Sequence, residues 1–229
     1  DWYINQLNSP LLSAIGPVAR DLLHLIWRVK VSKSIFTEYV GAVTVRDEDA
    51  DQLTKMFTDY HFAVPHDETV QLHAADGTRK VYAYELHYRG PHSYYDDYDT
   101  KVGSHWIPHG EDRRFLFSNV THYDPLTSKD DLRVKQIMLK LWTNFAKFGN
   151  PTPSPINGII WPAVSRGENK PPSLDHLIIT PNPHIAQDTR CKVREFMSSL
   201  QIEKNHNLYS SIEPEAPRCY ALFNRLTKS

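Results

Sequence analysis

The chain of 229 residues is 40% hydrophobic and 23% charged, carries a formal net charge of −1, and is long enough for one sizeable core. This balance excludes the basic surface that nucleic acid or an anionic membrane would need. The longest apolar run, residues 22–27, is interrupted by His24 and followed by Arg28, so no membrane-spanning segment is expected. Residues 1–4 lack the basic start and apolar centre of a signal peptide.

Residues 49–62 predict the first amphipathic helix. Its first turn is acidic, as the helix dipole favours, and Pro65 lies just beyond its end. Its apolar side is made by Leu53, Met56, Phe57 and Tyr60. Residues 69–75 are also helix-like and end at Gly77. The pattern therefore predicts two separate helices here.

Residues 79–88 predict a strand. They are rich in aromatic and β-favouring residues and are bounded by Gly77 and Gly90. The order of helix, turn and strand is typical of a wound α/β sheet.

A longer helix is predicted at residues 130–148. One apolar stripe recurs at three- and four-residue spacing and consists of Val134, Ile137, Met138, Leu141, Trp142 and Phe145. Ser128 and Asp131 have the spacing of a capping box. Gly149 supplies the end of the helix, and Pro151 prevents its continuation.

Prolines are dense and periodicity is weak in residues 150–183, which predicts a long surface excursion. A short strand at residues 177–179 interrupts it, and residues 189–200 predict a last helix.

Cys191 and Cys219 allow one disulfide, and two buried thiols fit the count equally well. The triplet that begins at Asn119 (Asn-Val-Thr) is an N-glycosylation sequon. Together these features favour an extracellular, secreted protein.

Twelve histidines raise the question of a metal site. His105 and His109 have a four-residue spacing that would place two ligands on one helix face. Pro108 lies between them and disfavours a helix, and no cysteine or carboxylate completes a ligand set. No metal site is therefore predicted.

His109 lies between a proline and a glycine, in a loop that ends in an aromatic cluster at residues 115–117. A loop position lets an imidazole project into a cleft while a sheet holds the loop in place. The alternative is a structural or surface histidine, which this segment taken alone favours.

Four segments together resemble the type-B carboxylesterases and cholinesterases. Two of them are the histidine motif PHGED (residues 108–112) with FLF (115–117), and the helix end LWTNFAKFGNP (141–151) with Trp161-Pro162 downstream. The other two are residues 57–65 and 81–85, which match the helix and strand that lead to the histidine. Their order and rough spacing agree, and the resemblance covers about residues 2–200.

The resemblance implies an α/β class fold. Residues 1–200 would form the C-terminal part of an α/β-hydrolase domain, a mixed and mostly parallel sheet flanked by helices, and residues 201–229 a C-terminal tail. A separate N-terminal chain would complete this fold as the companion in a heterodimer.

In that family a serine on a strand-to-helix elbow attacks the ester, a histidine acts as the base, and an acid orients the histidine. The resemblance assigns the base to His109 and the acid to Asp1 or a residue just before it. The sequence contains no Gly-x-Ser-x-Gly elbow. This chain alone is therefore not expected to hydrolyse esters, and it needs no cofactor.

Two functions remain open. A non-catalytic, neuroligin-like relative would bind an apolar ligand, such as a pigment, sterol or terpenoid, or a protein partner. A cleaved serine carboxylesterase would instead use His109 with a serine from the companion chain. The chain start at the acid position narrowly favours the binding protein, because an α-ammonium near His109 would disfavour the charged imidazole.

An apolar pocket would have five candidate walls by their position in the motif: Trp2, Tyr3, Leu7, Leu11 and Trp106. For each of them taken singly, core packing is the favoured interpretation. An independent fold of these 229 residues is the least favoured arrangement, because a half-sheet would leave an apolar edge in water.

Overall fold

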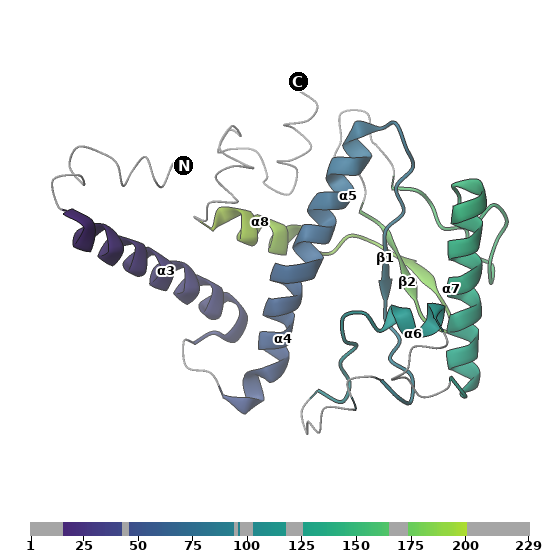
Figure 1. Cartoon of the computed structure of the whole chain (residues 1–229), viewed down its shortest axis with the longest axis horizontal. Helices are drawn as coiled ribbons and strands as arrows, with labels where there is room; N and C mark the ends of the chain where they lie inside the picture. Colours follow the sequence, from purple (N-terminus) through teal and green to yellow (C-terminus); the bar gives the residue numbers. More distant parts are fainter. Residues whose placement is uncertain are drawn as a thin grey trace. The chain divides into compact units, whose positions relative to one another are not determined.

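The computed structural model describes residues 16–42, 46–93, 96, 103–117, 126–164 and 174–200. The chain divides into two units. Residues 1–72 and 189–229 form the first, here called the helical unit, and residues 73–188 form the second, here called the sheet unit. Figure 1 labels most of their helices and strands.

The first described helix of the helical unit is α3 (Gly16–Val40), which is not predicted from the sequence. Three of its residues recur every four positions and pack against a small core: Val31, Ile35 and Tyr39. That core is built from Val64, Met197 and Leu200. Among the described helices, none combines the length and apolarity that crossing a membrane requires.

The next helix passes through Pro65 instead of ending before it. α4 (Ala50–Thr58) continues through a π-helical turn (Asp59–Ala63) into α5 (Val64–Asp76). The expectation of two helices separated near the proline is therefore wrong.

The π turn explains how proline is accommodated. The backbone N–H of Val64 donates to the carbonyl of Asp59, five residues earlier. A proline in a regular helix would clash with the carbonyl four residues earlier, and the wider turn changes the carbonyl positions just before Pro65. The predicted apolar side of α4 is also only partly correct, because Met56 is buried whereas Phe57 and Tyr60 are exposed.

The last described helix of the helical unit is α8 (Cys191–Ser199), which lies within the predicted range 189–200. Its residues Val193, Phe196 and Met197 join the small core with α3 and α5.

The sheet unit contains three strands in the order β1 (Tyr84–Leu86), β2 (His176–Ile179) and β3 (His184–Ala186). β1 and β2 are parallel, and β2 and β3 are antiparallel, so the sheet is mixed. β1 is shorter than the predicted strand 79–88, although Ala83 and His87 still form backbone hydrogen bonds to β2.

β2 is the central strand and is buried along its whole length. The prediction of a strand at residues 177–179 is confirmed, but the surrounding stretch is not a surface excursion. Ile156 and Trp161 from the same stretch are also buried in the main core. Density of proline therefore indicates irregular backbone here, and not exposure.

α7 (Lys129–Phe148) confirms the predicted helix and both of its ends. The N–H of Asp131 donates to Ser128 Oγ (2.9 Å), and the N–H of Ser128 donates to Asp131 Oδ2 (3.3 Å), which completes the capping box. Gly149 adopts a left-handed conformation with φ of 62°.

The main core lies between α7 and one face of the sheet. The buried members of the α7 stripe are Val134, Ile137, Met138 and Leu141. From the sheet they meet Leu177 and Ile179, which the register places on the same face as Tyr84 and Leu86. The core thus holds in place the segment that follows β1, where the predicted histidine lies.

Candidate functional site on the His109 turn

His109 lies at the second position of a tight turn. The N–H of Glu111 donates to the carbonyl of Pro108 (3.2 Å), and Gly110 at the third position has φ of 85°. A hydrogen bond of this kind with positive φ at the third position is typical of a type II turn, which favours glycine there. The imidazole of His109 is exposed at the tip of this turn.

A tryptophan anchors the segment that enters the turn. The N–H of Trp106 donates to the carbonyl of Gly103 (2.9 Å), and the buried Gly103 has φ of 81°. A Cβ on Gly103 would overlap the indole ring, so only glycine fits beneath it. The half-buried Trp106 also packs edge to face on His105. The indole ring of Trp106 therefore packs within its own loop, against Gly103 and His105.

The short helix α6 (Asp112–Leu116) anchors the segment that leaves the turn. Phe115 is fully buried in the main core. Asp112 accepts a hydrogen bond from Tyr84 Oη (3.1 Å), which ties the start of the helix to β1. Burial, together with the neighbouring Asp112 carboxylate, raises the pKa of Tyr84 well above its usual range.

A buried carboxylate lies directly after the turn. The side chain of Glu111 is 1% exposed, and its Oε2 accepts from Ser93 Oγ (2.8 Å). Arg114 Nη1 lies 3.7 Å from its Oε1. Burial raises the pKa of Glu111, although the Ser93 hydrogen bond and the charges of Arg114 and Arg89 oppose this rise. Glu111 belongs to the histidine motif, but its burial is not predicted from the sequence.

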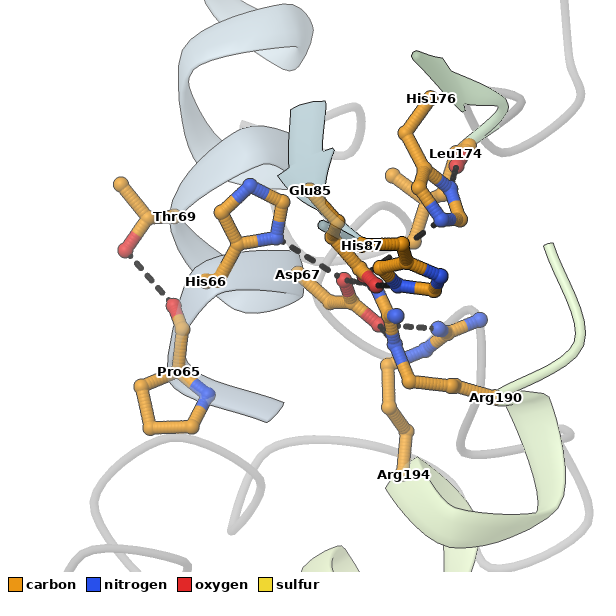
Figure 2. Close-up of polar contacts among 10 residues, drawn as sticks. All are labelled: Pro65, His66, Asp67, Thr69, Glu85, His87, Leu174, His176, Arg190 and Arg194. Atoms are coloured by element: carbon orange, nitrogen blue, oxygen red, sulfur yellow. Dashed lines mark hydrogen bonds and ion pairs between the residues drawn. The ribbon is translucent and has the colours of Figure 1, made fainter. Parts of the chain in front are cut away.

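A second polar cluster lies on the sheet face opposite the main core (Figure 2). Glu85 lies between two histidines, with Oε2 2.9 Å from His87 Nε2 and Oε1 3.4 Å from His176 Nε2. The buried His176 also places Nδ1 3.1 Å from the carbonyl oxygen of Leu174. Within the described ranges, no three His, Cys, Asp or Glu side chains are arranged to hold a metal ion.

A third cluster joins α5 and α8 within the helical unit. Figure 2 shows the side chains of Arg190 and Arg194 converging on Asp67. Asp67 Oδ1 accepts from Arg190 Nη2 (2.6 Å), and Oδ2 accepts from Arg190 Nε (3.0 Å) and Arg194 Nη1 (2.6 Å). Burial alone would raise the pKa of Asp67, but hydrogen bonds from His66 and Arg190 and both guanidinium charges hold it well below its usual range.

Comparison with known proteins identifies the family of this chain. A model of the carboxylesterase family matches residues 4–197. The chain belongs to the carboxylesterase family. The resemblance inferred from the four segments is thereby confirmed.

Two esterases are similar to part of this carboxylesterase-family chain. Juvenile hormone esterase of Tribolium castaneum is 31% identical over 98 residues, which are 41% of this chain and 16% of that protein. Carboxylesterase 1E of Rattus norvegicus is 33% identical over 109 residues, 46% of this chain and 18% of that protein. The chain thus spans only a small part of the length of these relatives.

A third relative carries a different kind of name. Neuroligin-2 of Homo sapiens is 24% identical over 180 residues, which cover 70% of this chain and 20% of that protein. The chain is therefore similar both to proteins named as esterases and to a protein named as a neuroligin.

The structure describes only some of the predicted site residues. His109 and Trp106 lie on the one loop, with His109 exposed and Trp106 half-buried. Cys191 is disulfide-bonded. The remaining predicted residues lie outside the described ranges: Asp1, Trp2, Tyr3, Leu7, Leu11, Asn119 and Cys219. The predicted acid and most of the predicted pocket walls therefore stay predictions.

Proposed function

We propose that this chain supplies the histidine base of a serine ester hydrolase, with the nucleophilic serine on a portion of the fold outside these 229 residues. The observation that carries the proposal is the position of His109, exposed at the tip of a type II turn that is anchored on both sides. The relatives named as esterases support it. This position favours the esterase over the binding interpretation.

The geometry suits general base catalysis. A base must lie within hydrogen-bond reach of the hydroxyl that it deprotonates, so its position has to be held closely. The Trp106 packing before the turn and the buried Phe115 after it hold the backbone, while the imidazole stays accessible. His109 would take the proton of the serine and return it to the leaving alcohol, and Asp1 or a residue before it would orient the ring.

The position of β1 at the edge of the described sheet supports a companion portion of the fold. β1 is an edge strand of the described sheet, yet its residues pack partly into the main core. An edge strand of this kind is a template for another strand. We propose that a nucleophile-bearing portion pairs there, as a separate N-terminal chain in a heterodimer or on a longer polypeptide.

Ester hydrolysis by the whole protein tests the proposal. The complete protein or complex is assayed with p-nitrophenyl butyrate and labelled with a fluorophosphonate, as wild type, His109→Ala and His105→Ala. The proposal predicts that His109→Ala lowers kcat by at least about 10³-fold and abolishes labelling. His105→Ala is a milder comparison, because it removes another exposed histidine that packs on Trp106, and it should lower the rate far less than His109→Ala. Equal rates for the two variants, or a wild type without hydrolysis or labelling, would overturn the proposal.

A binding function is the second candidate, favoured by the neuroligin-2 match across 70% of the chain. The protein would then be a secreted glycoprotein with a glycan at Asn119, and it would bind a protein partner or an apolar molecule without catalysis. A cognate ligand bound with equal affinity by wild type and His109→Ala, in a protein without esterase activity, would support this candidate.

A further inference from the structure

Glu111 is buried although it lies in the turn that carries an exposed histidine. The residue is 1% exposed, and it lies two residues after the exposed His109. Carboxylates are seldom fully buried unless they are paired, because burial of their charge costs free energy. A role for this side chain in holding the loop would account for its position.

The carboxyl group connects the turn to another segment. Its Oε2 accepts from the buried Ser93, which follows β1 in the chain, while the backbone N–H of the same residue closes the turn on Pro108. One residue therefore closes the turn and attaches it to the β1 side of the sheet unit.

The next acid in the sequence, Asp112, attaches a different part of the same segment. Asp112 accepts from Tyr84 Oη and so attaches the start of α6 to β1. Its contact lies one residue further from the turn and does not involve the turn hydrogen bond. The two adjacent acids thus attach two successive positions of the backbone, and Glu111 is the acid nearer to His109.

We infer that Glu111 is a positioning residue for His109, acting through the turn that it closes and anchors to Ser93. Loss of the carboxyl group would leave the backbone of the turn without its buried attachment. His109 would then sample more orientations, although Glu111 itself touches neither substrate nor nucleophile. The inference rests on the proposed function only in assigning His109 the role of base.

Burial of Glu111 weakens its attachment to Ser93, because burial disfavours the ionised carboxylate. Burial raises the pKa of Glu111, and Asp96 adds to this, while Ser93, Arg114 and Arg89 favour the ionised form. The amide of glutamine keeps an oxygen that can accept from Ser93, whereas alanine keeps none. Glu111→Gln is therefore the conservative variant and Glu111→Ala the disruptive one.

The experiment compares Glu111→Ala, Glu111→Gln, Ser93→Ala and Asp131→Asn in the complete protein or complex. Asp131 is an equally buried acid of the same unit, with hydrogen bonds to Ser128 and Tyr88, and it controls for the loss of a buried carboxylate in general. The readouts are kcat, KM and the ring resonances of His109 in ¹⁵N-histidine-labelled protein. Thermal unfolding of each variant confirms that the samples are folded.

The inference predicts that Glu111→Ala lowers kcat on the order of 100-fold with KM nearly unchanged, as expected when a reacting group is misplaced by about 1 Å. Ser93→Ala should give a smaller loss and Glu111→Gln should restore most of the rate. The His109 resonances should shift or broaden in the same order, and Asp131→Asn should leave both readouts at the wild-type values.

Two results would separate the failure of this inference from that of the proposed function. If His109→Ala retains full activity, the base assignment fails, and the His109 resonances still test whether Glu111 holds the turn. If Glu111→Ala is folded and leaves both kcat and the His109 resonances unchanged, the positioning role is overturned.

Discussion

The two units each bury an acid beside arginines, with opposite outcomes. In the helical unit, Asp67 receives three hydrogen bonds from Arg190 and Arg194. In the sheet unit, Glu111 receives one from Ser93, and the guanidinium of Arg114 lies 3.7 Å away. The pKa of Asp67 is lowered and that of Glu111 is raised, although both side chains are 1% exposed.

The difference follows the hydrogen bonds and the charges around each acid. Burial penalises the charged form of both groups, and the hydrogen bonds and guanidinium charges around Asp67 overcome this penalty, whereas those around Glu111 do not. Asp67 therefore behaves as a structural ion that joins α5 to α8. Glu111 receives fewer hydrogen bonds, and it lies in the turn that carries the exposed His109.

Asp67→Asn should produce the largest change in stability. Removing the carboxylate leaves two guanidinium groups close together without their counter-charge, which costs about 3–5 kcal/mol for a buried pair. Urea unfolding of the whole protein measures this loss. Glu48→Gln, which removes an exposed acid from the helical unit, should change the free energy of unfolding by less than about 0.5 kcal/mol.

The pH dependence of the Asp67→Asn effect has a definite sign. Because the folded pKa lies below the unfolded value of about 3.9, the stabilisation is present above that value and is lost as the pH falls towards the folded pKa. The difference between wild type and variant should therefore be constant above about pH 5 and shrink below it. A difference that grows on acidification would contradict the assignment.

Arg190→Lys should have the next largest effect, about 2 kcal/mol. The guanidinium of Arg190 donates to both oxygens of Asp67, and a lysine ammonium cannot reproduce this planar fork. Urea unfolding again gives the value. Arg79→Lys, a change at an exposed arginine, serves as the control. Equal stability of Arg190→Lys and wild type would show that charge alone, without the fork, explains the low pKa of Asp67.

Two tyrosines in similar contacts, one in each unit, test whether the units differ only in the clusters around Asp67 and Glu111. Tyr39 donates to Asp59 (2.9 Å) in the helical unit, and Tyr84 donates to Asp112 (3.1 Å) in the sheet unit. Burial and the nearby carboxylates raise the pKa of both. Replacing either by phenylalanine should cost about 1 kcal/mol. A difference of several kcal/mol between the two variants would show that the units differ more generally.

Local signals were enough to predict the helix α7. Its apolar stripe, its capping serine and its terminal glycine all lie within one continuous segment. The histidine motif is local in the same sense, because Pro108 and Gly110 determine the turn that presents His109. These two elements could therefore be predicted, because the residues that determine them are close together in the sequence.

The polar clusters that were missed depend on distant partners. Asp67 and Arg190 are 123 residues apart in the sequence, and Glu111 is buried against Ser93 from another segment. Nothing in the local pattern of either acid distinguishes it from an exposed one. The helix through Pro65 was missed for a different reason, since a π turn removes the rule that proline ends a helix.

Glu111→Gln should have the smallest effect on stability, about 1 kcal/mol or less. The pH dependence of this effect distinguishes Glu111 from Asp67 most directly. The folded pKa of Glu111 lies above its unfolded value of about 4.3, so the folded state prefers the protonated group. The wild type therefore loses stability as the pH rises through the folded pKa, whereas the glutamine variant does not titrate. The variant should gain on the wild type as the pH rises above about 4, opposite in sign to the trend for Asp67→Asn. Urea unfolding as a function of pH measures both trends, with Asp130→Asn, an exposed acid on α7, as the control. Parallel trends for Asp67 and Glu111 would mean that burial, and not the number of hydrogen bonds, sets the behaviour of both acids.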